Sequence, residues 1–251
     1  MIKSFSHLRV ASEYSISHGL ITIDQIVDQA VKNNMPSVAL TDNLNMFGLV
    51  KFFIKAEKKG IKPISGSSIK VIFEGDDFAH ELLCLAKNNN GHKNLMKILS
   101  QSHNNIHFPS PIITFEELCL LKNDIKVISG GKSSHIFDLL KRGKVEDTKT
   151  KLETFQSAFG EDFVIEVQKT NRADELDYIS HVLPLASEKG IPVIATNDVI
   201  FSNKEDYDIH ETKVCINTGK TLNDPNREKK FSNEQFFKSQ EQMSELFNNC
   251  D

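Results

Sequence analysis

The chain has 251 residues, of which 39% are hydrophobic and 25% charged, and its formal net charge is −4. This composition excludes a disordered or fibrous protein, and the length suits one large α/β domain or two small ones. The negative net charge argues against independent, non-specific binding to a nucleic-acid backbone.

The first third of the chain alternates between helical and strand patterns. Thr22 and Gln25 have capping-box spacing, and the apolar residues that follow recur at helical period, which predicts an amphipathic helix. The short apolar run 37–41 predicts a buried strand, 47–59 a helix and 61–65 another strand. In this part of the chain a predicted helix therefore follows a predicted strand, and another strand follows that helix.

The same alternation continues along the chain. Further strand candidates are the alternating segment 69–73 and the runs 82–86, 126–129, 163–168 and 192–196. Helical patterns separate most of them. Repeated β-then-α order predicts an α/β fold with mainly parallel strands and covering helices, as a closed barrel or an open sheet.

Polar and glycine-bearing residues follow the predicted strands. They are 42–43, 66–68, 130–132, 169–171 and 197–198. Because sites in parallel α/β folds are built at the carboxyl ends of strands, these clusters favour one shared site. The alternative is that they are ordinary turn residues.

Residues 130–133, Gly-Gly-Lys-Ser, invite a phosphate-loop interpretation. The full pattern requires a glycine five residues before Gly131, and Lys126 stands there. We therefore predict a strand-to-helix turn with Ser133 or Ser134 as the N-cap.

The end of the chain differs in composition from the rest. Residues 217–227 are rich in Thr, Gly, Asn, Asp and Pro and predict a loop or linker, and 233–251 is helical in tendency. We expect one domain over 1–216, with 217–251 forming a linker and the start of a further segment.

The spacing of the cysteines and the length of the apolar runs indicate in which cellular compartment the protein works. The four cysteines, Cys84, Cys119, Cys215 and Cys250, make no paired zinc or redox spacing and predict reduced thiols. Neither a secretory signal nor a bilayer-spanning run is found, so we expect a cytoplasmic protein without membrane contact.

Five residues are of the kinds that bind divalent metals: His7, Asp42, Glu166, Asp198 and His210. Several of them lie at predicted strand ends. Scattered His and Asp side chains are also common as surface or hydrogen-bonded residues, so both interpretations stay open at this point.

Seven separated motifs add a family resemblance. They are 7–15, 38–48, 60–66, 85–88, 91–95, 194–199 and 218–225. In this order they resemble the PHP domain of bacterial DNA polymerase III alpha subunits, over almost the whole chain. The resemblance implies a distorted seven-stranded, TIM-like α/β barrel and, where the metal ligands are retained, a metal-dependent phosphoesterase or 3′-to-5′ exonuclease.

This chain departs from the active family at most ligand positions. The substituted positions are Arg9, Ala11, Asn43, Ser68, Thr170 and Ile200, and the vestigial ligands are His7, Asp42, Glu166 and Asp198. Neither arginine nor isoleucine can ligate a metal, so we expect no catalytic residue, no cofactor and at most one weakly held divalent ion. We expect the Arg9 guanidinium to replace the metal's charge by pairing with Asp42 or Asp198, with an exposed Arg9 as the alternative.

Three functions are compatible with the resemblance. The first is a non-catalytic domain that stabilises the alpha subunit and binds the proofreading exonuclease epsilon subunit. DNA contact and Mg²⁺-dependent nucleotidyl transfer would then belong to the rest of the polymerase chain. The second is an active phosphoesterase or exonuclease, which needs the missing ligands. The third is a barrel enzyme acting on a small metabolite, which the motif at 218–225 argues against.

Overall fold

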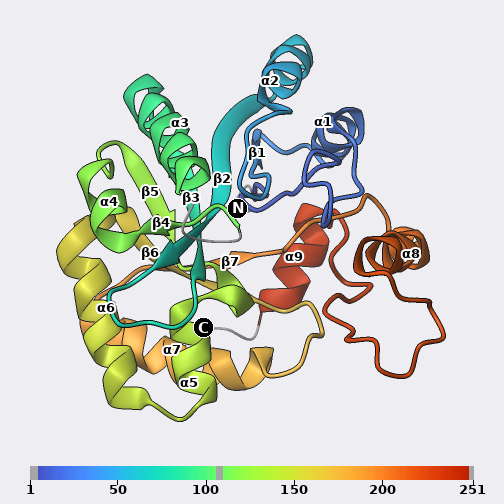
Figure 1. The fold of residues 1–251 in the computed structure, drawn as a ribbon. Coiled ribbons are helices and arrows are strands. Elements are labelled where there is room, and N and C mark those ends of the chain that lie inside the picture. Colours follow the sequence, from blue (N-terminus) through green and yellow to red (C-terminus); the bar gives the residue numbers. More distant parts are fainter. Residues whose placement is uncertain (1–4, 106–109, 249–251) are drawn as a thin grey trace.

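A computed structural model describes residues 5–105 and 110–248 (Figure 1), and its strands pair into one mixed sheet. The strands are β1 (Ser37–Leu40), β2 (Lys62–Ile72), β3 (His80–Ala86), β4 (Ile113–Thr114), β5 (Ile125–Ile128), β6 (Phe163–Gln168) and β7 (Val193–Thr196). Their order is β1-β2-β3-β5-β6-β7, and β4 pairs with β2 outside this path.

Most neighbouring strands are parallel, as the sequence predicts. β1 and β2 pair in parallel, and so do β5, β6 and β7. β3 is the exception, because it runs antiparallel to both β2 and β5.

The sheet curls, and the segment 7–11 bridges the gap between its two edge strands. On one side, the Ala39 amide donates to the His7 carbonyl at 2.9 Å, and the Thr41 amide donates to the Val10 carbonyl at 2.9 Å. On the other side, the Ala11 amide donates to the carbonyl of Val199 at 2.9 Å, just after β7. The expected distorted α/β barrel with seven strands is therefore confirmed for the described residues.

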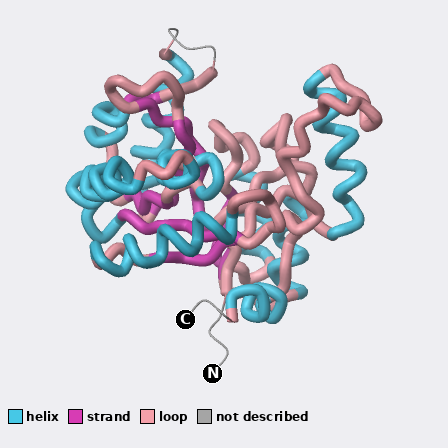
Figure 2. The backbone as a smooth tube through the Cα atoms, turned by 90° about the horizontal axis from the view of Figure 1, so that it is seen from below, coloured by secondary structure: helices cyan, strands magenta, loops and turns pink. Residues whose placement is uncertain are grey.

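Helices surround the curled sheet, and α8 lies apart from the strands at one side (Figures 1 and 2). They are α1 (Ile23–Lys32), α2 (Leu49–Lys58), α3 (Asn89–Asn104), α4 (Phe115–Leu120), α5 (His135–Lys141), α6 (Val145–Phe159), α7 (Glu175–Lys189), α8 (Tyr207–Thr218) and α9 (Gln240–Phe247). The predicted capping box is present at α1, where the Thr22 side chain accepts from the Gln25 amide. No helix within the described ranges is long and apolar enough to cross a bilayer.

The two faces of each strand pack against different surroundings. On β3, Leu82 and Cys84 face outward into the large core formed with the helices, whereas Leu83 and Leu85 face inward. The inward residues join Val164 of β6 in a small apolar cluster. Because side chains alternate along a strand, Glu81 and Glu166 also point into the barrel.

Three local predictions need correction or refinement. The segments 61–65 and 69–73 form one strand, β2, because residues 62–65 pair with β1 and 66–71 pair with β3. The predicted C-terminal helix is shorter, since only 240–247 is helical, and 249–251 lies outside the described residues. Ser134 is the N-cap of α5, which confirms the strand-to-helix turn.

The three cysteines within the described residues are free thiols. Cys84 and Cys215 are buried free thiols, Cys119 is a half-buried free thiol, and Cys250 lies outside the described residues. Burial raises the pKa of Cys84 to about 12, which makes its thiol unreactive.

Candidate functional site

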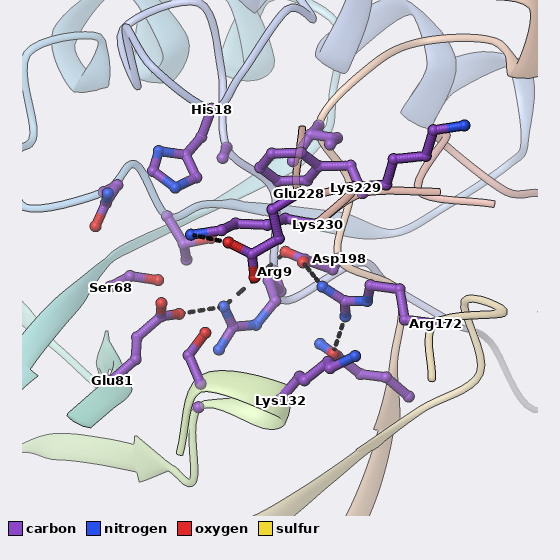
Figure 3. A pocket seen from close by; sticks show the side chains of 18 residues that line it. Arg9, His18, Ser68, Glu81, Lys132, Arg172, Asp198, Glu228, Lys229 and Lys230 are labelled. Carbon is purple, nitrogen blue, oxygen red and sulfur yellow. Dashed lines mark hydrogen bonds and ion pairs between the residues drawn. The ribbon is translucent and has the colours of Figure 1, made fainter. Parts of the chain in front are cut away.

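A cavity of about 360 Å³ opens where the carboxyl ends of the strands meet (Figure 3). Its lining includes residues from four of the predicted polar clusters: Asn43, Ser68, Gly130, Lys132 and Asp198. The shared face expected from the sequence is therefore present. Parallel strands bring their carboxyl ends to one edge, which is why segments distant in sequence meet there.

Arg9 lies at the centre of this cavity and is buried. Its Nε donates to Glu166 Oε1 at 2.9 Å and its Nη2 to Glu166 Oε2 at 3.0 Å, a two-pronged pairing. Nη1 donates to Glu81 and lies 4.0 Å from Asp198 Oδ1. Although burial opposes the positive charge, attraction to these carboxylates raises the pKa of Arg9 well above its ordinary value.

These contacts decide between the expectations for Arg9. The exposed alternative is wrong, because the residue is 7% exposed. The expected pairing with Asp198 is present as a longer ion pair, whereas pairing with Asp42 is wrong. The closest partners are Glu166 and Glu81, which the sequence does not identify as partners of Arg9.

A second arginine, Arg172, holds the other side of Asp198. Its Nη1 lies 3.1 Å from Asp198 Oδ2, and its Nη2 donates to Gln168 Oε1 at 2.7 Å. Its Nε pairs with Glu175 at 3.0 Å. Burial opposes ionisation of Asp198, but the charges of Arg172 and Arg9 outweigh it and lower the pKa of this carboxyl.

Asp42 and His7 are buried in separate hydrogen-bond environments, and neither is among the described residues that line the cavity. Asp42 Oδ1 accepts from the Ser12 amide at 2.7 Å and from Ser15 Oγ at 2.7 Å. Burial raises its pKa, although these hydrogen bonds oppose the shift. His7 Nε2 lies 2.8 Å from the Lys238 carbonyl, and burial lowers the pKa of this imidazole to about 4.

The substituted positions mostly face the cavity. Arg9, Ala11, Asn43, Ser68 and Ile200 line it. Thr170 is buried beside it, and its hydroxyl donates to Glu175 at 2.6 Å.

His210 is not part of this arrangement. Its Nε2 lies 2.6 Å from the His18 carbonyl, and its ring packs against Phe231 with centroids 4.7 Å apart. Of the two interpretations left open for His210, the structure favours the hydrogen-bonded residue, because it lies outside the lining of this cavity.

The segment 228–231, which the sequence predicts to follow a linker, covers one side of the cavity (Figure 3). Lys230 pairs with Glu228 at 3.2 Å, and Phe231 packs against His18 with centroids 5.9 Å apart. No local pattern marks this segment as part of a site, because its approach depends on the tertiary path of the chain.

The comparisons with known proteins identify the family. The model of the PHP domain matches residues 7–170, which include Arg9, Asp42 and Glu166. The chain belongs to the PHP domain family. This PHP domain is 36% identical over 245 residues to a DNA polymerase III subunit alpha of Pasteurella multocida, covering 97% of this chain and 21% of that protein. It is 37% identical over 246 residues to the one of Vibrio cholerae, with the same coverage.

The chain thus spans about a fifth of the length of these relatives and matches their N-terminal region. A solved structure from Chromobacterium violaceum, described as an amidohydrolase with bound sulfate and no metal, has the same fold. Its TM-score is 0.55 at 13% identity, covering 83% of this chain and 96% of that one.

A cluster of several divalent ions, such as the family resemblance implies for active members, does not fit the side chains at this cavity. Both oxygens of Glu166 accept from Arg9, and Asp198 Oδ2 accepts from Arg172 and from Gln235 Nε2 at 2.9 Å. Asp42 is satisfied by two serines. The carboxylates therefore already have cationic or hydroxyl partners, and a guanidinium occupies the middle of the cluster.

Proposed function

We propose that this chain is the N-terminal PHP domain of a bacterial replicative DNA polymerase III alpha subunit. We further propose that it acts there as a non-catalytic structural domain and binds the proofreading exonuclease epsilon subunit. The extent of the similarity to alpha subunits, 97% of this chain, supports the first part. In this proposal the domain works in the cytoplasm, and DNA synthesis with its Mg²⁺ belongs to the rest of the alpha chain.

The two-pronged pairing of Arg9 with Glu166 is the observation that supports the proposed non-catalytic role. A metal-dependent phosphoesterase needs an ion with an open position, where bound water becomes a nucleophile at neutral pH. The guanidinium of Arg9 supplies positive charge to the same carboxylates, but it cannot coordinate a water molecule as a metal does or turn it into hydroxide. The guanidinium therefore favours a structural role, in which it holds the carboxylates at the mouth of the barrel in place.

Hydrolysis assays test this part directly. The purified protein is incubated with a single-stranded oligonucleotide and with a chromogenic phosphoester, in added zinc or manganese. We expect no turnover above the buffer rate. Turnover that persists in repeated preparations and is lost in Asp198→Asn would overturn the non-catalytic role, because that variant alters only the cavity described above.

Binding assays test the partner. We expect the chain and the epsilon subunit of the same organism to form a complex by titration calorimetry and by co-elution in gel filtration. If epsilon binds neither this chain nor the full-length alpha subunit, the partner proposal is wrong. The hydrolysis result would then stand independently.

A further inference from the structure

A second group of ligand-type side chains lies outside the barrel, away from Arg9. Asp76 follows β2, His80 begins β3 and His135 begins α5. His80 lies on the opposite face of β3 from Glu81, because neighbouring residues of a strand alternate. The group therefore faces α5 and α6, and it lines a separate pocket of about 400 Å³.

One distance within this group matches that between two ligands of a zinc ion, and the third ligand atom lies close by. One ligand atom from each of Asp76, His80 and His135 lies within 4.8 Å of the others. His135 Nδ1 and Asp76 Oδ2 are 3.3 Å apart. Two ligands bound tetrahedrally to zinc, each about 2.0–2.1 Å from the ion, are about 3.3 Å from one another.

Two of these atoms are buried without a hydrogen bond: His135 Nδ1 and Asp76 Oδ2. The His135 side chain is only 8% exposed, so solvent does not easily replace the missing partner. A buried polar atom left unpaired costs about 1–3 kcal/mol, which makes two adjacent cases unfavourable without a shared partner. A cation between them would satisfy both.

Asp76 supplies negative charge next to the two imidazoles, whereas basic residues also line the pocket. Among the neighbouring acids, Asp138 pairs with Arg142 at 3.0 Å and Asp147 with Lys144 at 3.2 Å. Lys151 also lines the pocket, and its ammonium lies over the Phe73 ring at 3.6 Å. Its charge opposes a bound cation, whereas the carboxylate of Asp76 attracts one.

We propose that Asp76, His80 and His135 bind one zinc ion, with the fourth position open to water. Two imidazoles and one carboxylate favour zinc over Mg²⁺ or Ca²⁺, which prefer oxygen ligands. The ion would tie the turn between β2 and β3 to the start of α5. The two imidazoles are stacked, with centroids 4.1 Å apart and planes 12° apart, so the half-buried His80 must turn its ring to ligate.

Zinc binding to the chelator-stripped protein tests the proposal by titration calorimetry, with cobalt absorption as a report on tetrahedral geometry. We expect about one zinc per chain. His80→Ala and Asp76→Asn should each weaken binding at least ~tenfold and abolish the zinc-induced rise in Tm. Circular dichroism is used to check that both variants fold.

His181→Ala is the matched control, because His181 is an exposed histidine that lies 3.6 Å from Asp177 in α7. It should bind zinc as the parent does. Absence of zinc binding, or binding that survives both His80→Ala and Asp76→Asn, overturns the proposal. Binding that survives both and is lost in Asp198→Asn would place the ion at the barrel mouth instead, and hydrolysis tests that case separately.

Discussion

Replacing Arg9 with methionine tests the central feature of the barrel mouth. The substitution keeps most of the aliphatic volume of Arg9, whose side chain is 8% exposed, but removes its guanidinium. Glu166, which is 0% exposed, then loses both of its two-pronged hydrogen bonds, and Glu81 loses an ion pair. Removing one partner of a buried ion pair costs about 3–5 kcal/mol, because the other charge stays buried and unpaired.

Urea unfolding followed by circular dichroism measures this loss as a change in the free energy of unfolding. Arg142→Met is the matched control, because Arg142 is 55% exposed and pairs with Asp138 one turn away on α5. We expect this control to lose no more than about 1 kcal/mol. An Arg9→Met protein whose stability is within ~0.5 kcal/mol of the parent would refute the argument that Arg9 neutralises a buried carboxylate cluster.

Two further predictions concern buried groups near the barrel mouth. The pKa of His7 is lowered from 6.5 to about 4, so its contribution to stability is complete above pH 6.5 and is lost as pH falls toward 4. This loss amounts to about 3 kcal/mol, and His7→Gln should reduce the difference in unfolding free energy between about pH 7 and about pH 4.5. An unchanged difference would contradict it. At Gly130, where φ is +81°, an added Cβ would lie 2.0 Å from the Glu81 carbonyl oxygen. Gly130→Ala should cost at least ~2 kcal/mol, against about 1 kcal/mol for Gly143→Ala, which also has positive φ but open space. Equal losses in urea unfolding would show that the contact with Glu81 is unimportant.

Local rules identified several elements correctly because neighbouring residues determine them. Thr22 and Gln25 cap α1 through their own side chains, and the Ser134 side chain caps α5 by accepting from the Phe137 amide. The run 163–168 is buried along its whole length, as a central parallel strand requires. The β-then-α order then predicted the shared cavity at the strand ends.

Other elements could not be read locally. Gly66 and the serines after it resemble a turn, but pairing with β3 keeps them extended within β2. Residues 233–239 have helical tendency, yet the Phe237 amide donates to the Phe201 carbonyl at 3.1 Å, which holds that part of the chain beside another segment. In both cases tertiary hydrogen bonds override local propensity.

The sequence by itself determined the α/β class, the edge at which a site forms and the loss of ligand-type side chains at positions such as Arg9 and Ile200. Only the tertiary structure decided which carboxylates surround Arg9, because strand direction and alternation place Glu81 and Glu166 inside the barrel. The same alternation sends His80 to the outer face, where it meets Asp76 and His135. Contacts between residues far apart in sequence depend on how the sheet closes, and no local pattern contains that information.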